Sequence, residues 1–307
     1  MSLDELLESG SVPTKGDVTE EELAKLFRKF RGLQKKQERD QAFWAATNEN
    51  LKTAYEKLDE KDRELARAYA IIQDDLSVAS KIQGALLPEL PGKMASDLEL
   101  AVHHKQLAEV GGDYYDFFKT CSGNHAIGVF DISGHGVSAA LVMTYLKAQF
   151  MTILETLDSP KAIVEWVNST SYDFLKTVKK YATVNFVVMN ATALRYVSGG
   201  GFGLLLSGKN STAFQKRDSF LGLRRRPFHE HELPFKKGDL LAMYTDGIVE
   251  AQNDKGEDYS VQRLNDLIFR NAKKPVRDIV DLCVKDYTNF RSKDSDDITL
   301  LILRKKV

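Results

Sequence analysis

Residues 127–136 read Ile-Gly-Val-Phe-Asp-Ile-Ser-Gly-His-Gly. The first part is rich in β-branched and aromatic side chains, as strands are, and the second part has the glycines of a turn. Asp131 therefore stands near the end of a predicted strand, 125–132, where the chain enters a turn. A carboxylate in this position is well placed to leave the core and to meet other groups in a cleft.

Three further aspartates lie at similar places in the sequence. Asp246 follows the apolar run Leu-Leu-Ala-Met-Tyr-Thr and precedes Gly247, Asp296 stands just before the last predicted strand, and Asp113 follows two glycines. Any one of them could simply cap a helix or form a turn. Converging carboxylates repel one another, however, and a cation offsets that repulsion. An all-oxygen ligand set suits Mg²⁺ or Mn²⁺ better than zinc or copper, so the set of four predicts a divalent metal site.

The other predicted elements come as runs of strands and pairs of helices. This order favours an α+β fold over alternating βαβ units. Further strands are predicted at 98–103, 114–118, 182–189, 194–197, 202–206, 240–245 and 298–303, and helices at 137–156, 160–180, 261–271 and 275–291.

A long helical arm, residues 20–87, is predicted ahead of these elements and behind a flexible leader, residues 1–19. Thr19 and Glu22 form a capping-box pattern, and Pro88 ends the helix. A break near Gly32 or the glutamines that follow it is compatible with the pattern. Every seventh position from 51 to 86 is apolar: Leu51, Leu58, Leu65, Ile72, Ala79 and Leu86.

This heptad repeat predicts a self-associating coiled coil and a homodimer through residues 51–86. The companion positions are only partly apolar, since Asp62 and Gln83 are among them. An amphipathic helix that packs on its own domain therefore stays open as an alternative.

Composition excludes several classes of protein. The chain has 43 basic and 44 acidic residues and a net charge of −1, without the basic excess typical of nucleic-acid binding. No apolar run approaches the roughly 20 residues that span a bilayer. The N-terminus lacks a signal-peptide pattern, and Cys121 and Cys283 are far apart. We therefore expect a cytoplasmic protein with free thiols and no nucleic-acid or membrane partner.

Five segments together resemble the SpoIIE/RsbU-type branch of the metal-dependent serine/threonine protein phosphatases, the PPM or type 2C superfamily. They occur in the family's order within residues 78–307, the predicted phosphatase domain being 88–307. The segments are 79–88 (Ala-Ser-Lys-Ile-Gln-Gly-Ala-Leu-Leu-Pro), 109–116 (Glu-Val-Gly-Gly-Asp-Tyr-Tyr-Asp), 131–136 (Asp-Ile-Ser-Gly-His-Gly), 244–251 (Tyr-Thr-Asp-Gly-Ile-Val-Glu-Ala) and 296–299 (Asp-Asp-Ile-Thr).

The resemblance implies a four-layer αββα sandwich with two or three Mn²⁺ or Mg²⁺ ions at one edge. Asp131 would bridge two ions, the backbone carbonyl of Ile132 would help to hold one, and Asp246 and Asp296 would bind the other. Asp113 would act through metal-bound water or a further ion.

The implied catalytic residues are Asp131 and Asp246, which act through a metal-bridging hydroxide that attacks phosphorus in line. No side chain forms a covalent phospho-enzyme. Asp297 is the weaker candidate of the 296–297 pair, because Asp296 takes the ligand's place in the motif.

The resemblance also implies a partner, a phosphorylated bacterial regulator of the anti-sigma-factor-antagonist type in a partner-switching pathway. An upstream activator would bind the arm and act through the junction at residues 82–87. One segment departs from the family, because residues 198–202 read Ser-Gly-Gly-Gly-Phe where an Asn-Ala-Gly-His type motif is common. This departure motivates a second hypothesis, a pseudophosphatase that serves as a dimeric phosphoprotein-binding module.

Overall fold

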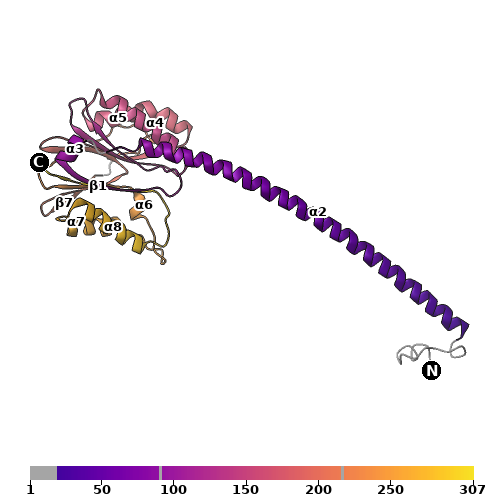
Figure 1. Cartoon of the computed structure of the whole chain (residues 1–307). Helices are drawn as coiled ribbons and strands as arrows, with labels where there is room; N and C mark the ends of the chain where they lie inside the picture. Colours follow the sequence, from indigo (N-terminus) through magenta and orange to yellow (C-terminus); the bar gives the residue numbers. More distant parts are fainter. Residues whose placement is uncertain (1–18, 90–91, 216–217) are drawn as a thin grey trace. The chain divides into compact units, whose positions relative to one another are not determined.

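The structure, a computed structural model, describes residues 19–89, 92–215 and 218–307 (Figure 1). All but the last residue of the predicted leader, 1–19, lies outside these ranges. The chain divides into two compact units, Met1–Ile72 and Gln73–Val307.

The arm is one continuous helix, α2 (Glu20–Leu86), of 67 residues. The predicted capping box is confirmed: the Thr19 backbone N–H donates to Glu22 Oε2 at 2.9 Å, and the Glu22 N–H donates to Thr19 Oγ1 at 3.4 Å. The helix has no break near Gly32 or the glutamines that follow it, although the sequence left one open. A glycine in a helix costs only about 1 kcal/mol relative to alanine, and strong helix formers flank this one.

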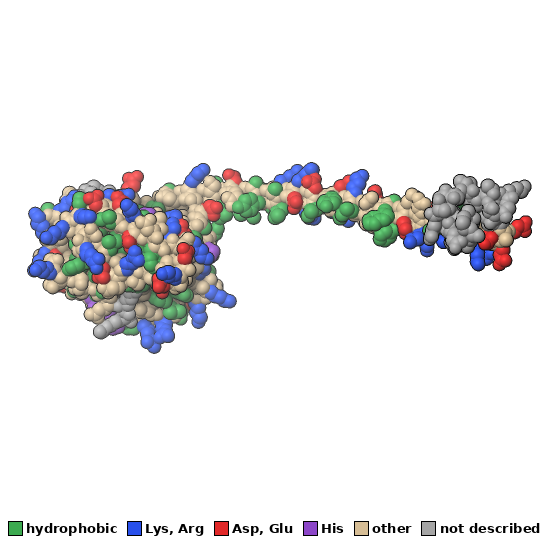
Figure 2. Space-filling view, turned by 90° about the horizontal axis from the view of Figure 1, so that it is seen from below, with side chains coloured by type: hydrophobic (Ala, Val, Ile, Leu, Met, Phe, Trp, Pro, Cys, Tyr) green, Lys and Arg blue, Asp and Glu red, His purple; other side chains and the backbone are tan. Residues whose placement is uncertain are grey.

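The heptad side chains of the arm are exposed in the single chain. Leu51, Leu58 and Leu65 are 52%, 56% and 69% exposed, and other hydrophobic side chains recur along the same helix (Figure 2). Burying such side chains is worth roughly 1.5–3 kcal/mol each, so an interface that covered this face of the arm would gain a large hydrophobic free energy.

The second unit contains two five-stranded antiparallel sheets, whose strand orders are β1-β10-β9-β6-β7 and β2-β3-β4-β5-β8. The first sheet consists of β1 (Leu98–Lys105), β10 (Ile298–Lys305), β9 (Leu240–Tyr244), β6 (Phe202–Ser207) and β7 (Asn210–Ala213). The second consists of β2 (Tyr114–Lys119), β3 (His125–Ile132), β4 (Ala182–Met189), β5 (Ala193–Gly199) and β8 (His231–Pro234).

Helices cover the outer face of each sheet, which confirms the expected α+β fold and its αββα layers (Figure 1). The second sheet carries α4 (Val137–Leu154) and α5 (Pro160–Thr177). The first carries α7 (Val261–Asn271), α8 (Val276–Phe290) and the short α6 (Asp246–Val249). A further short helix, α3 (Gly92–Asp97), leads into β1.

Successive residues of the central strands face opposite sides of each sheet, and their apolar side chains form three layers. Ile127 and Val129 of β3 pack between the sheets, whereas Phe130 and Ile132 pack beneath α4 and α5. Residues that alternate in a strand point to opposite faces, and both faces are covered here. This double burial explains why the strands appear in the sequence as nearly continuous apolar runs.

Among the described residues, α4 is the one helix whose length and composition would allow it to cross a membrane. Its side chains Val142, Met143 and Leu146 are buried against the second sheet in the layer that also contains Phe150 and Phe130. Packing inside the sandwich therefore accounts for the apolar composition of α4.

The elements missing from the sequence prediction are short. They are α3, α6 and the edge strands β7 and β8, each with four to six residues. Strand β7 is fully exposed and carries small polar side chains, so its strand state depends on pairing with β6 and not on an apolar pattern. The longer predicted elements agree with the structure to within about three residues at their ends.

Candidate metal centre

The fold brings three of the predicted aspartates to one edge of the two sheets. Strands β9 and β10 pair so that Tyr244 lies opposite Leu300, which sets Asp246, the first residue of α6, beside the chain that enters β10 after Asp296. Asp131 comes from the end of β3 in the other sheet. The carboxylates of the two sheets therefore meet at the edge.

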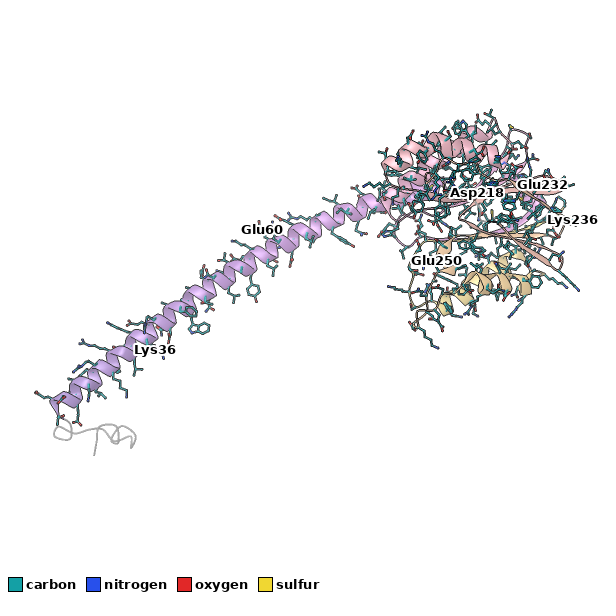
Figure 3. All side chains as sticks on the ribbon, turned by 180° about the vertical axis from the view of Figure 1, so that it is seen from behind. Lys36, Glu60, Asp218, Glu232, Lys236 and Glu250 are labelled. Atoms are coloured by element: carbon teal, nitrogen blue, oxygen red, sulfur yellow. The ribbon has the colours of Figure 1, made fainter. Side chains whose placement is uncertain are left out.

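The environment at this edge raises the pKa values of two of these carboxylates, Asp131 and Asp296. Burial, and then the charges of Asp246 and Asp296, raise the pKa of Asp131 to about 7. Glu250, labelled in Figure 3, adds a smaller repulsion. The pKa of Asp296 is also raised, first by burial and then by neighbouring carboxylates. A cluster of this kind is stabilised by a cation.

Asp113 lies beneath this cluster and is 2% exposed. Its Oδ2 accepts hydrogen bonds of 2.7 Å from the hydroxyls of Thr245 and Thr299. Burial, followed by the charge of Asp131, holds the pKa of Asp113 well above its usual range. The two threonines thus fix a buried carboxyl group next to the end of β3, a role that the sequence motif did not reveal.

Asp297 braces the loop that contains Gly111 and Gly112. One oxygen accepts the Leu107 N–H at 2.7 Å, and the other accepts the Gly112 N–H at 2.6 Å and the Asp113 N–H at 3.3 Å. The glycines allow this close approach, because a Cβ at Gly111 would lie 2.3 Å from Asp297 Oδ2. Asp297 therefore uses both of its oxygens within the protein.

Gln83, near the end of α2, makes a two-way contact with the same loop. Its Nε2 donates to the Gly111 carbonyl at 2.8 Å, and its Oε1 accepts the Gly111 N–H at 3.1 Å. The adjacent Gly112 packs against strand β3, where a Cβ would come within 2.7 Å of the Ile132 carbonyl oxygen. Gln83 therefore contacts Gly111, and the adjacent Gly112 contacts the end of β3 that contains Asp131.

The turn after Asp131 is held by the chain that follows α5. The Ser133 N–H donates to the Tyr181 carbonyl at 2.8 Å, and the Tyr181 N–H donates to Ser133 Oγ at 3.0 Å. Lys180 Nζ donates to the Ser133 carbonyl at 2.7 Å. Sequence analysis did not single out Lys180 or Tyr181, because neither lies in a motif.

The departure at residues 198–202 forms the turn between β5 and β6. Ser198 Oγ donates to Asn185 Oδ1 at 2.6 Å, and Asn185 Nδ2 donates to the Phe202 carbonyl at 2.6 Å. Gly200 has a φ of +82°, and a Cβ there would collide with the ring of Phe220. The segment therefore accommodates a neighbouring loop and leaves the aspartates in place.

The donor set fits hard divalent cations. Among the described residues, no group of three or more histidine, cysteine, aspartate or glutamate side chains is arranged to hold an ion by itself. Mg²⁺ commonly binds through one or two carboxylates and keeps several water ligands, so a shared, open cluster suits it. Asp131, Asp246, Asp296 and the Ile132 carbonyl are the groups that would hold such ions.

The two cysteines stay outside the site. Both are free; Cys121 is exposed and Cys283 is buried in the layer under α7 and α8. Burial raises the pKa of the Cys283 thiol to about 12, as expected for an unreactive thiol.

Comparison with known proteins identifies relatives of this chain. The family model described as Stage II sporulation protein E (SpoIIE) matches residues 122–306. Phosphoserine phosphatase RsbU of Bacillus subtilis (strain 168) is 28% identical over 252 residues, which cover 77% of this chain and 71% of the relative.

Solved structures share the architecture. The PP2C domain of SiaA from Pseudomonas aeruginosa superposes with a TM-score of 0.70 at 23% identity, over 77% of this chain and 98% of that domain. The catalytic domain of the serine/threonine phosphatase PstP, in complex with two manganese ions, gives a TM-score of 0.52 at 13% identity, over 69% and 99% of the two chains.

Replacing Asp297 with Asn should destabilise the fold, whereas Asp296→Asn should not. An amide cannot accept all three backbone N–H groups with both of its ends, and bonds to a charged group contribute about 1.5–3 kcal/mol. We expect Asp297→Asn to lower the free energy of unfolding by about that amount in urea melts of the metal-free protein. Equal losses in the two variants would contradict this assignment.

The stability of the metal-free protein should depend on the ionisation of Asp131. Its native pKa of about 7 lies above the ordinary aspartate value of 3.8, so the native state holds the proton more tightly than the unfolded state. This contribution is fully present below about pH 4 and is lost as the pH rises to about 7. Asp131→Asn should therefore gain stability relative to wild type across that interval.

Thermal melts with EDTA at several pH values measure this gain. Asp254→Asn, at an exposed turn, is the matched control. A stability difference between Asp131→Asn and wild type that stays constant from about pH 4.5 to 7.5 would be incompatible with the raised pKa.

Proposed function

We propose that this chain, which belongs to the SpoIIE family of PP2C-type serine phosphatases, hydrolyses phosphoserine or phosphothreonine on a regulator of the anti-sigma-antagonist type. The observation that carries the proposal is the convergence of Asp131, Asp246 and Asp296 from two sheets into one carboxylate cluster. The similarity to a phosphoserine phosphatase supports a phosphoprotein substrate.

Each residue of the edge has a role in this proposal. Asp131, Asp246, Asp296 and the Ile132 carbonyl would hold two Mn²⁺ or Mg²⁺ ions. When bound, such ions supply a hydroxide nucleophile near neutral pH and offset the charge of the phosphoryl oxygens. The protein's own side chains contribute by positioning. Asp113 is bonded to Thr245, which precedes Asp246, and Asp297 holds the loop that contains Gly112.

The alternative of a pseudophosphatase has less support. It rests on residues 198–202, and these pack against Phe220 and Asn185 without displacing any aspartate of the cluster. No catalytic aspartate of the motifs is missing from the sequence.

We further propose that the end of α2 regulates the site. Gln83 holds Gly111, and Asp297 holds Gly112 of the same loop. A rotation or shift of residues 82–87 would therefore change the position of the loop that lies against Ile132. An activator that binds the arm could bias such a two-state element by its differential affinity for the two positions.

The arm is also proposed to form a homodimer through residues 51–86. The exposed Leu51, Leu58 and Leu65 lie seven residues apart, which is the spacing of a coiled-coil seam.

Turnover should require both the metal and the cluster. Wild type with Mn²⁺ should hydrolyse p-nitrophenyl phosphate and a phosphoserine protein, and EDTA should abolish both reactions. Asp246→Asn should lower kcat/KM by at least about 1000-fold, because two-metal chemistry supplies most of the acceleration for phosphate monoesters. Circular dichroism provides the folding control, and full activity of a metal-free Asp246→Asn protein would exclude the mechanism.

Self-association should depend on the heptad leucines. Leu58→Asn with Leu65→Asn should raise the dimer Kd by at least about 100-fold, since burial of each leucine is worth roughly 1.5–3 kcal/mol. The matched control is Glu60→Asn with Arg67→Asn, which has the same spacing and the same new residue on the same helix. Light scattering that gives the 34.5 kDa monomer for wild type would refute the dimer.

A further inference from the structure

The segment 218–229 between β7 and β8, here called the arginine loop, is a firmly held surface feature. Its two ends are joined, because the His229 N–H and Nδ1 contact the Asp218 carboxylate at 3.0 and 2.7 Å (Figure 3 labels Asp218). Leu221 and Phe228 are buried at 0% and 1% exposure. Both side chains belong to the apolar layer beneath α4 and α5, so the loop is anchored in the core of the unit.

Helix α5 fixes the backbone of the arginine loop. Asn168 Oδ1 accepts the Gly222 N–H at 2.8 Å, and its Nδ2 donates to the Arg224 carbonyl at 3.0 Å. Glu165 accepts the Phe228 N–H at 3.0 Å. None of these contacts uses an arginine side chain, so the loop does not need those side chains in order to fold.

Two of the three consecutive arginines are available for a partner. Arg225 pairs with Asp173 at 2.7 Å and lies over the ring of Tyr172. Arg224 and Arg226 are exposed, and within the described parts of the chain neither guanidinium has an ion pair. Both border a groove of about 370 Å³ that Phe220 and Leu223 also line.

A series of contacts links this groove to the turn that follows Asp131. Phe220 stacks on Tyr181, with ring centroids 5.4 Å apart, and Tyr181 exchanges two backbone hydrogen bonds with Ser133. Ser133 is two residues from Asp131. The loop also pairs with the start of β4 through Leu221 and Ala182, and Ala182 lies opposite Ile132.

The charges of the groove favour an acidic ligand. Among the described residues, Arg224 and Arg226 line the groove without an ion pair, whereas the Asp218 carboxylate, which also lines it, is already bonded to His229. A phosphoserine at the cluster places the residues that flank it along the neighbouring surface. A groove with this chemistry matches an acidic peptide segment better than a neutral one.

We propose that Arg224 and Arg226 of the arginine loop bind acidic residues flanking the phosphorylated residue, and thereby select the protein substrate. This inference rests on the proposed phosphatase function and adds to it a specificity-determining surface. Gly199 and Gly200 make the surface possible, because they allow Ser219 and Phe220 to approach the β5–β6 turn closely.

The test compares two phosphoserine peptides of equal length, one with glutamates on both sides of the phosphoserine and one with glutamines. Arg224→Gln with Arg226→Gln should lower kcat/KM for the glutamate peptide about five- to tenfold, through KM, and should leave the glutamine peptide and p-nitrophenyl phosphate unchanged. The wild-type preference should shrink in high salt, which screens exposed charge pairs.

Arg225→Gln is the matched control, because Arg225 is already paired with Asp173. It should keep the preference for the glutamate peptide. A second readout is the anisotropy of the labelled glutamate peptide bound to Asp246→Asn protein, with and without the two arginine substitutions, which measures docking without turnover.

The outcomes separate the two proposals. Turnover and binding that do not depend on Arg224 and Arg226 would leave the phosphatase function intact and overturn the docking surface. Arginine-dependent binding in a protein that never hydrolyses either peptide would support the surface and count against the phosphatase. Equal losses for both peptides, or tighter arginine-dependent binding of duplex DNA or anionic vesicles, would also overturn the inference.

Discussion

The gathering of carboxylates at one sheet edge is the constraint on which the rest of the molecule depends. Asp131, Asp246 and Asp296 come from opposite sheets, and burial, followed by the repulsion of the other two carboxylates, raises the pKa of Asp131 to about 7. Such a cluster opposes folding unless a cation or protons offset its charge. The apolar layers between and outside the sheets supply the free energy that keeps the carboxylates together. Unfavourable arrangements at functional sites commonly persist because the surrounding structure stabilises them.

The groups around the cluster act mainly by restricting backbone positions. Asp297 accepts hydrogen bonds from three backbone N–H groups of the segment 107–113. Gln83 accepts a hydrogen bond from the Gly111 N–H and donates one to the Gly111 carbonyl in the same segment. Glycines at 111 and 112 are needed there because Asp297 and the Ile132 carbonyl lie where a side chain would be. The two glycines of the motif Gly-Gly-Asp are thus needed because neighbouring atoms leave no room for a side chain. The third residue, Asp113, has its carboxyl group held by two threonine hydroxyls.

The sequence was sufficient for the layers and for singling out Asp131, Asp246 and Asp296, because both are recorded in local patterns; the assignment of these aspartates as metal ligands stays a prediction. Continuous apolar strands that end in aspartate and glycine predicted β3 and β9, and the family motifs predicted the sandwich. Strand β8 was missed because its state depends on pairing with β5, which is distant in the sequence. Strand β7 pairs with the adjacent β6 across a short turn, but it carries no apolar pattern. Lys180, Tyr181 and the role of Asp297 were missed for the same reason: each acts through backbone groups that no side-chain pattern encodes.

The departure at residues 198–202 has a physical consequence beyond the loss of a polar motif. The glycines at 199–201 leave the β5–β6 turn without side chains. Ser219 and the ring of Phe220 fill the space at 199 and 200, and Asn185 fills the space at 201. That ring stacks on Tyr181, which is bonded to the turn after Asp131. A side chain at the turn could have contacted a substrate directly. In its absence Ser219 and Phe220 of the arginine loop occupy that space, so the proposed substrate selection would depend on a loop whose backbone is fixed by α5.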